Sequence, residues 1–249
     1  VVGIVENAGQ QALRSLAAAA LVGELKADST VVTRLDREME QLLEPQLREL
    51  DPGAGFLGEE YGFRGASRER LWVVDPIDGT ANLVHGIPMW GIAVGLLEAQ
   101  ESVLGVFHLP LLGETFAAAT GQGAVLNGVP LAPQDIGELA SEDTLVATSR
   151  SLRRVDFVPV QGRLRALGSI CAELCYAAAG RFAGCISMGD KLTDMVAPVC
   201  VCREAGLRLE WLSGGSFHFE GMEERLGHDA LVVAPEATNA YLRGNLSLR

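Results

Sequence analysis

Two aspartates three positions apart follow a short apolar run in the string WVVDPIDGT, where a strand would deliver two carboxylates to a turn. Asp75 and Asp78 offer the hard oxygen ligands that Mg²⁺ prefers, and the carbonyl group of Ile77 between them offers another. The backbone N–H groups of Gly79 and Thr80 follow at the expected start of a helix, where phosphate oxygens are readily bound. Asp-Pro and Asp-Gly are each common in plain surface turns. The complete string after an apolar strand is more specific and predicts a site for divalent cations and phosphate.

Two other acidic segments reinforce this prediction. Glu59 and Glu60 follow an expected short strand, and Thr33 and Asp36 open an expected helix. Each segment also has a simpler interpretation. The glutamates would suit an exposed acidic turn, and Thr33 would cap its helix with Asp36 favourable in the first turn.

Taken in order, these motifs resemble those of the inositol monophosphatase family. That family belongs to the lithium-sensitive, metal-dependent phosphatase superfamily, which includes fructose-1,6-bisphosphatase. The segments that carry the resemblance are VTRLD from Val32, GEE from Gly58, DPIDGT from Asp75 and DMVAP from Asp194. The resemblance spans almost the whole chain, with a highly specific central motif and a degenerate C-terminal one.

The resemblance implies two or three Mg²⁺ ions at one site. Glu59, Asp75 and the Ile77 carbonyl would hold the first ion. Asp75, Asp78 and Asp194 would hold the second, so that Asp75 bridges the two ions. The glutamate next to Glu59 would support a further, weaker ion.

Catalytic and substrate-binding roles are implied in the same way. Thr80 would hydrogen-bond Asp36 and, together with Glu59, would orient the attacking water. The residues implied to contact the substrate are Asp78, Gly79, Thr80, Gly168, Ser169 and Ser187.

Three positions depart from the family pattern. Thr193 stands where the family usually has tryptophan, and Pro198 stands at a glycine position that we expect to fall in the first turn of a helix. Ser187 replaces a glutamate that binds substrate hydroxyls in inositol-selective members, which weakens inositol phosphate as the preferred substrate. Asp190 and Lys191 nearby offer other polar contacts.

Periodicity and turn residues predict the elements that must position these groups. Helices are expected over residues 5–25, 33–50, 169–179 and 193–205. Strands are expected over residues 55–58, 71–74, 89–97, 101–108, 115–119, 124–126, 144–148, 183–188, 207–211 and 231–234. The earlier strands form an antiparallel meander, and the later ones alternate with helices.

With the resemblance, this pattern implies an α/β fold, an α+β layered sandwich of the αβαβα sugar-phosphatase type. Residues 1–135 would form an N-terminal metal-binding domain with an antiparallel-rich sheet. Residues 136–249 would form a smaller C-terminal α/β domain that completes the active site.

Composition limits the partners. The formal net charge is −12, and an acidic surface repels nucleic acids and anionic membranes, so neither is an expected partner. No apolar run reaches transmembrane length. The five cysteines lack zinc-type spacing and predict buried free thiols in a reducing cytoplasm, with a regulatory thiol pair as the alternative. Lys26 and Asp28 lie where family members often have a mobile loop over the metals, and a plain solvated loop fits equally.

The expected function is Mg²⁺-dependent hydrolysis of the phosphate monoester of a small polyol or sugar, by two-metal activation of water. Histidinol phosphate and 3′-phosphoadenosine 5′-phosphate remain alternative substrates. A catalytically silent regulatory homologue is the alternative outside enzyme chemistry. The resemblance also implies a homodimer.

Overall fold

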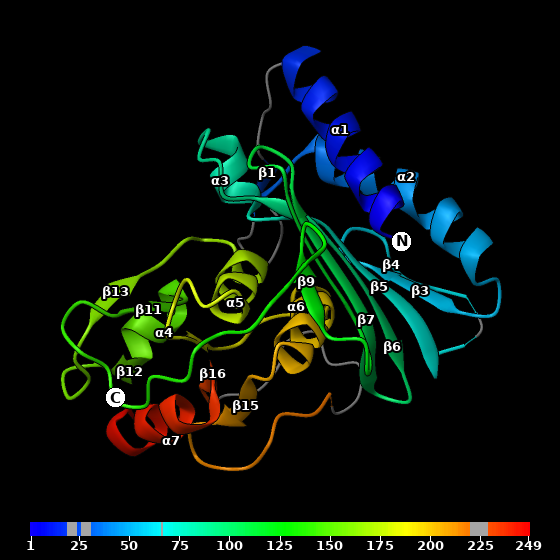
Figure 1. Cartoon of the computed structure of the whole chain (residues 1–249). Helices are drawn as coiled ribbons and strands as arrows, with labels where there is room; N and C mark the ends of the chain where they lie inside the picture. The colour runs from blue at the N-terminus through cyan, green and yellow to red at the C-terminus, as the bar shows by residue number, and fades with distance from the viewer. Residues whose placement is uncertain (19–23, 26–30, 66, 220–228) are drawn as a thin grey trace.

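Layers of helix and sheet alternate through the chain in a computed structural model (Figure 1). The structure describes residues 1–18, 24–25, 31–65, 67–219 and 229–249. The helices are α1 Val2–Ala18, α2 Arg34–Leu50, α3 Thr80–Val84, α4 Ser149–Arg154, α5 Ile170–Ala178, α6 Leu192–Glu204 and α7 Glu236–Asn245. In the part of the chain that is described, none of them is both long and apolar enough to cross a membrane.

Most of the strands belong to two sheets, and the rest form two short pairs. The strands are β1 Glu24–Leu25, β2 Val31–Val32, β3 Gly55–Gly58, β4 Gly62–Arg64, β5 Arg70–Asp78, β6 Gly91–Glu98, β7 Glu101–Leu109, β8 Glu114–Ala119, β9 Ala124–Leu126, β10 Val129–Pro130, β11 Thr144–Ala147, β12 Val155–Asp156, β13 Arg163–Arg165, β14 Gly184–Ser187, β15 Arg208–Trp211, β16 Leu231–Ala234 and β17 Ser247–Leu248.

The larger sheet has the order β10-β9-β8-β7-β6-β5-β3-β4. Its neighbours pair antiparallel except for β3 and β5, which run parallel. This confirms the expected antiparallel meander. The hairpin between β9 and β10 turns at Asn127 and Gly128, both with positive φ, as a two-residue Asn-Gly turn requires.

Both faces of the larger sheet are covered. Side chains alternate along a strand, so Leu71 and Val73 of β5 pack into the cluster that contains α5 and α6. Trp72 and Val74 point the other way, into the cluster with α1 and α2. The two pairs of helices therefore lie on opposite faces (Figure 1).

The smaller sheet has the order β13-β11-β14-β16-β15 and mixes parallel and antiparallel pairs. Cys185 of β14 packs with α5, whereas its neighbour Ile186 packs in a third cluster with Leu242 of α7. The order of layers is thus α1/α2, large sheet, α5/α6, small sheet and α7. The expected layered α/β sandwich is confirmed. The division at residue 135 stays a prediction.

Some boundaries differ from the expected ones. Leu25 was expected in the first helix, but it pairs with Val31 in a short ribbon, apart from the described span of α1, Val2–Ala18. Strand β5 was expected to turn at Asp75, but it continues to Asp78 through a bulge. Helix α3 begins at Thr80, where the start of a helix was expected, but helices α4 and α7 were not expected. With so few turns, α4 shows too little periodicity to be recognised.

Two glycines let α6 lie directly on the large sheet. Gly95 of β6 and Gly105 of β7 face each other in the register. A Cβ atom on Gly105 would lie 2.1 Å from the carbonyl oxygen of Ala197, and one on Gly95 would lie 2.5 Å from a Val196 methyl group. The backbones of α6 and the large sheet are therefore in van der Waals contact, about one helical turn after Asp194.

Pro198 is the seventh residue of α6, so the expectation that it lies in the first turn is wrong. Proline has no N–H group, which leaves the carbonyl of Asp194 without its usual helical partner. The thiol of Cys171 on α5 donates to this carbonyl at 3.1 Å. The proline is therefore accommodated by a side chain from the neighbouring helix.

Candidate active site

Three carboxylates from distant parts of the chain converge at one end of the large sheet. Oxygen atoms of Glu59, Asp75 and Asp194 all lie within 4.8 Å of one another. Gly58 pairs with Val74 in the parallel β3–β5 ladder, and the Glu59 N–H donates to the Val74 carbonyl at 3.1 Å. Glu59 therefore emerges beside Asp75, while α6 brings Asp194 from above the sheet.

A β-bulge places Asp75 and Asp78 on the same side. In a regular strand, residues three apart point to opposite faces, but the register shifts between these two positions. The Ile77 N–H donates to Asp75 Oδ1 at 3.0 Å within the bulge. Asp78 Oδ2 accepts hydrogen bonds from the Ser169 hydroxyl and, at 2.9 Å, from the Cys171 N–H.

Burial and mutual repulsion raise the pKa values of these acids. Burial is the main cause for Asp75 and Asp194, whose pKa values lie well above the usual range, and neighbouring carboxylates raise them further. The pKa of Asp78 rises to about 6, mainly through burial and against the hydrogen bonds it accepts. Carboxylate and carbonyl oxygens are the donors that Mg²⁺ prefers, and a divalent cation would relieve this repulsion. The donor set therefore fits the expected metal.

These acids open into a cleft of about 460 Å³. The sequence-predicted residues that line it are Glu59, Asp75, Ile77, Asp78, Gly79, Thr80, Gly168, Ser169 and Asp194. Ser187 does not line the cleft. It is fully buried, and its hydroxyl has no hydrogen-bond partner within the described chain, so its contact with substrate stays a prediction. Lys26 and Asp28 lie outside the described residues.

Asp36 lies behind the cleft and reaches it through Thr80. The Thr80 hydroxyl is 2.9 Å from Asp36 Oδ1 and also 2.9 Å from the Ile77 carbonyl. The Thr33 hydroxyl donates to the other oxygen of Asp36 at 2.5 Å and caps α2 through the Leu35 N–H. Burial raises the pKa of Asp36, and these hydrogen bonds oppose the rise. Thr33 therefore caps α2, as the simpler interpretation expected, and the predicted hydrogen bond between Thr80 and Asp36 is also present.

Glu40 holds the loop that carries Glu59, and sequence reasoning missed it. Its two carboxylate oxygens accept the N–H groups of Glu60 at 2.7 Å and Tyr61 at 3.1 Å. Glu40 is fully buried, one helical turn after Asp36. Two acidic residues four positions apart on the apolar face of a helix were the available signal.

Replacing Glu40 by alanine is expected to lower both stability and activity. Two partly buried N–H groups would lose their acceptors, at up to about 1 kcal/mol each, and Glu59 would lose its support. Urea unfolding and steady-state rates are the measurements, with kcat expected to fall roughly 10- to 100-fold, as for other supports of metal ligands. Glu38→Ala, at an exposed position paired with Arg34 on the same helix, is the control and should change stability by less than about 1 kcal/mol. Equal effects of the two changes would contradict this role.

Glu173, also missed from the sequence, holds the loop that carries Gly168. Its Oε1 atom accepts the N–H groups of Leu167 at 2.7 Å and Gly168 at 3.2 Å. Its Oε2 atom is buried and has no partner in the described chain. Burial is the main reason why its pKa rises to about 7.

The raised pKa of Glu173 predicts a pH-dependent stability. A folded-state pKa above the ordinary 4.5 means that the folded chain binds the proton more tightly, so stability falls as pH rises from 4.5 to about 7. Glu173→Gln keeps an acceptor for both N–H groups and does not titrate. Its stability relative to wild type should therefore grow across this window, by up to about 3 kcal/mol. Urea unfolding in EDTA at a series of pH values measures the difference. Parallel curves for the two proteins would contradict the prediction.

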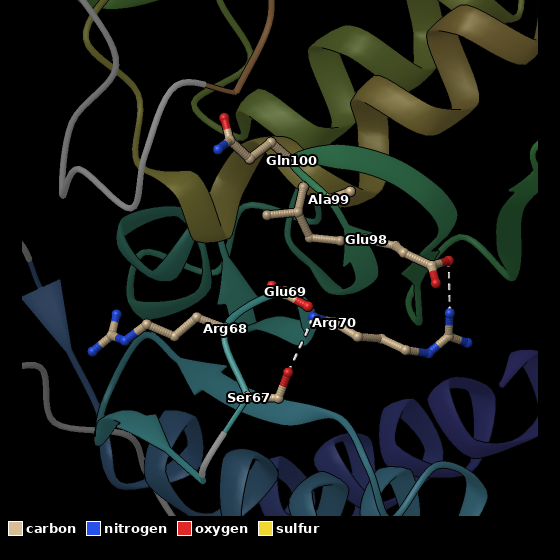
Figure 2. A pocket seen from close by; sticks show the side chains of 8 residues that line it. Ser67, Arg68, Glu69, Arg70, Glu98, Ala99 and Gln100 are labelled. Atoms are coloured by element: carbon tan, nitrogen blue, oxygen red, sulfur yellow. Dashed lines mark hydrogen bonds and ion pairs between the residues drawn. The ribbon is translucent and has the colours of Figure 1, made fainter.

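A larger hollow, of about 900 Å³, lies at the other end of β5 (Figure 2). Arg70 there pairs with Asp51 at 2.5 Å and with Glu98 at 2.7 Å. Strand β5 separates it from Asp78 by roughly 25 Å at 3.3 Å per residue. Two of its charged lining residues, Arg70 and Glu98, pair with each other, and the hollow contains none of the predicted site residues.

Comparisons with known proteins find relatives along almost the whole chain. The sequence profile of the inositol monophosphatase family matches residues 2–245. A histidinol-phosphatase from Chlorobaculum parvum is 31% identical over 247 residues, covering 96% of this chain and 92% of its own. A fructose-1,6-bisphosphatase/inositol-1-monophosphatase from Thermotoga maritima is 34% identical over 192 residues, covering 74% of this chain and 72% of its own.

A solved structure shows the same architecture. The extragenic suppressor protein suhB from Bartonella henselae superposes with a TM-score of 0.83 at 25% identity, covering 98% of this chain and 95% of its own. Its likeness extends over both sheets and the helices between them. With a profile match over nearly the whole sequence and relatives above 30% identity, the chain belongs to the inositol monophosphatase family.

Proposed function

We propose that the chain is a Mg²⁺-dependent phosphomonoesterase acting on a small polyol or sugar phosphate. The observation that carries the proposal is the convergence of Glu59, Asp75 and Asp194 within 4.8 Å, beside the Asp36–Thr80 pair. Relatives with phosphatase names support it.

Two sets of oxygen donors would hold the metal. Glu59, Asp75 and the Ile77 carbonyl would form one set, and Asp75, Asp78 and Asp194 the other. When bound, Mg²⁺ supplies charge neutralisation for the phosphate and lowers the pKa of a bound water. Ser169 and Cys171 hold Asp78 through its Oδ2 atom, so its Oδ1 atom would be left to bind the metal.

The protein's own groups would orient the water and hold the ester. With its proton directed to Asp36, the Thr80 hydroxyl keeps lone pairs that accept a hydrogen bond from the attacking water. Asp36 is then the acceptor at the end of this relay, and Glu59 flanks the same water. The Gly79 and Thr80 N–H groups would receive phosphate oxygens, while Gly168 and Ser169 would face the substrate's hydroxyls.

The choice of substrate is open within this class. The position of Ser187 argues against strict selectivity for inositol phosphate, and we propose broad specificity for sugar phosphates. Histidinol phosphate is a second candidate because the Chlorobaculum parvum histidinol-phosphatase matches over 96% of this chain.

The five cysteines are unpaired and buried, which supports a reducing, cytoplasmic compartment as part of the proposal. A homodimer is also part of the proposal, and sedimentation would test it.

Phosphate release from a panel of esters tests the proposal. The panel holds inositol 1-phosphate, fructose 1,6-bisphosphate, histidinol phosphate and 3′-phosphoadenosine 5′-phosphate, each with Mg²⁺ and with EDTA. We expect release that depends on Mg²⁺ and is lost in EDTA. Calorimetric binding of Mg²⁺ without release from any ester would instead favour the catalytically silent homologue.

A further inference from the structure

A lysine contacts the acidic cluster directly. The ammonium group of Lys191 lies 3.0 Å from Glu59 Oε1, and both side chains are largely shielded from solvent. The backbone N–H of the same residue donates to Asp194 Oδ2 at 3.1 Å, where it precedes the first turn of α6. Lys191 therefore touches two of the three converging carboxylates, one with its backbone and one with its charge.

Lysine is rare in this chain. Of its 20 basic residues, only Lys26 and Lys191 are lysines, and the rest are arginines. Arginine forms a planar fork that suits permanent carboxylate pairs, whereas lysine carries a compact point charge on a flexible stem. The residue at the acidic cluster is thus the basic type that can most easily exchange one partner for another.

Two cations then compete for one carboxylate. An ion that takes Glu59 as a ligand and the ammonium that pairs with Glu59 Oε1 carry the same sign of charge, and like charges repel strongly in a partly buried site. The only basic side chains lining the cleft in the described chain are Arg150 and Lys191. Arg150 instead lies over Gly189, where a Cβ atom would be 2.4 Å from its guanidinium.

We propose that Lys191 is a built-in counter-ion of the acidic cluster that must release Glu59 when a divalent cation binds. The exchange lowers the affinity for Mg²⁺, and the released ammonium turns to the phosphate of the substrate. Metal uptake and substrate capture are thereby linked through one side chain. The proposal rests on the proposed function in requiring that the cluster binds a divalent cation and that the substrate carries a phosphate.

Calorimetric titration with MgCl₂ tests the exchange. Lys191→Met should bind Mg²⁺ about tenfold more tightly than wild type, which corresponds to about 1.4 kcal/mol. Lys191→Arg keeps the charge and should stay within about threefold of wild type. Arg150→Met removes the other cation of the cleft and should leave the Mg²⁺ affinity within about twofold. At saturating Mg²⁺, Lys191→Met should also raise KM for the best ester more than it lowers kcat.

A second measurement leaves Lys191 itself unchanged and so does not depend on whether a variant at position 191 folds. With lysine labelled at the ¹³Cε position, the chain has two lysine signals, and Lys26→Arg leaves only that of Lys191. This signal should move as Mg²⁺ is added. An unmoved signal in a protein that binds Mg²⁺, or equal Mg²⁺ affinity in wild type and a folded Lys191→Met, would overturn the role of Lys191. A wild-type protein that takes up no Mg²⁺ would overturn the proposed function itself.

Discussion

Replacing Asp75 by asparagine is expected to remove Mg²⁺-dependent phosphate release and, at the same time, to stabilise the metal-free fold. Asp75 contributes to both proposed sets of metal donors, and loss of several kcal/mol of charge stabilisation lowers kcat/KM by about 10³-fold or more. Stability should rise because burial and the charges of Glu59, Asp194 and Asp78 hold the pKa of Asp75 well above its usual range. A group with such a raised pKa destabilises the fold once it is ionised. Asparagine keeps an oxygen for the Ile77 N–H.

The measurements are phosphate release with Mg²⁺ and thermal unfolding in EDTA at about pH 8, a value above the ordinary carboxyl range. Asp51→Asn is the matched control, because Asp51 lies away from the cleft and pairs with Arg70 at a distance of 2.5 Å. It should leave the rate unchanged and slightly lower the unfolding temperature. Asp75→Asn should therefore raise the unfolding temperature and remove activity, whereas Asp51→Asn should lower the unfolding temperature and leave activity unchanged. A variant at position 75 that keeps more than about a tenth of the wild-type rate would contradict the metal assignment.

Replacing Gly105 by alanine is expected to destabilise the protein strongly, because the added methyl group would collide with the backbone of α6. The new Cβ atom would lie 2.1 Å from the Ala197 carbonyl oxygen, and 2.9 Å and 3.0 Å from the carbonyl carbon and Cα of Ala197. These are backbone atoms of a packed helix, so they cannot rotate away. We expect a loss of about 3 kcal/mol, or roughly 6–12 °C in unfolding temperature for a chain of this size.

Two other glycines provide a graded comparison for this prediction. In Gly95→Ala the new Cβ atom would lie 2.5 Å from a Val196 methyl group and 2.9 Å from the Ala197 backbone nitrogen. These contacts are longer than the 2.1 Å contact at Gly105, so the loss should be smaller. Gly244→Ala in α7 meets nothing within 4 Å and should be neutral or stabilising by up to about 1 kcal/mol, because alanine favours helix. Thermal unfolding of the three variants gives the order. Equal unfolding temperatures for Gly105→Ala and Gly244→Ala would show that α6 does not rest on the sheet as described.

Much of the fold is predictable because many of its elements carry clear local signals. Helix α2 has an amphipathic pattern and a threonine cap, and β3, β9 and β16 are bounded by turn residues. The bulge between Asp75 and Asp78 is not predictable in this way. Periodicity alone would place these residues on opposite faces, and only the hydrogen bond from Ile77 to Asp75 reveals the local geometry.

The candidate site depends still more on tertiary structure. The family resemblance names Glu59, Asp75 and Asp194, but no local rule brings residue 194 beside residue 59. Glu40 and Lys191 act through contacts of 2.7 Å and 3.0 Å with loops far away in sequence. Such contacts do not appear in the periodicity of the sequence. Carboxylates and amines that support a site are therefore the residues that a motif search misses.

The paired glycines Gly95 and Gly105 also affect how the sequence can vary. The backbone of α6 contacts the strand backbone directly at Ala197. The distance of Asp194 from the sheet therefore does not depend on any side chain between the two. Elsewhere in the core, apolar residues can be exchanged for others of different shape with only local adjustment. The direct contact between these backbones therefore keeps the position of Asp194 independent of such exchanges elsewhere in the core.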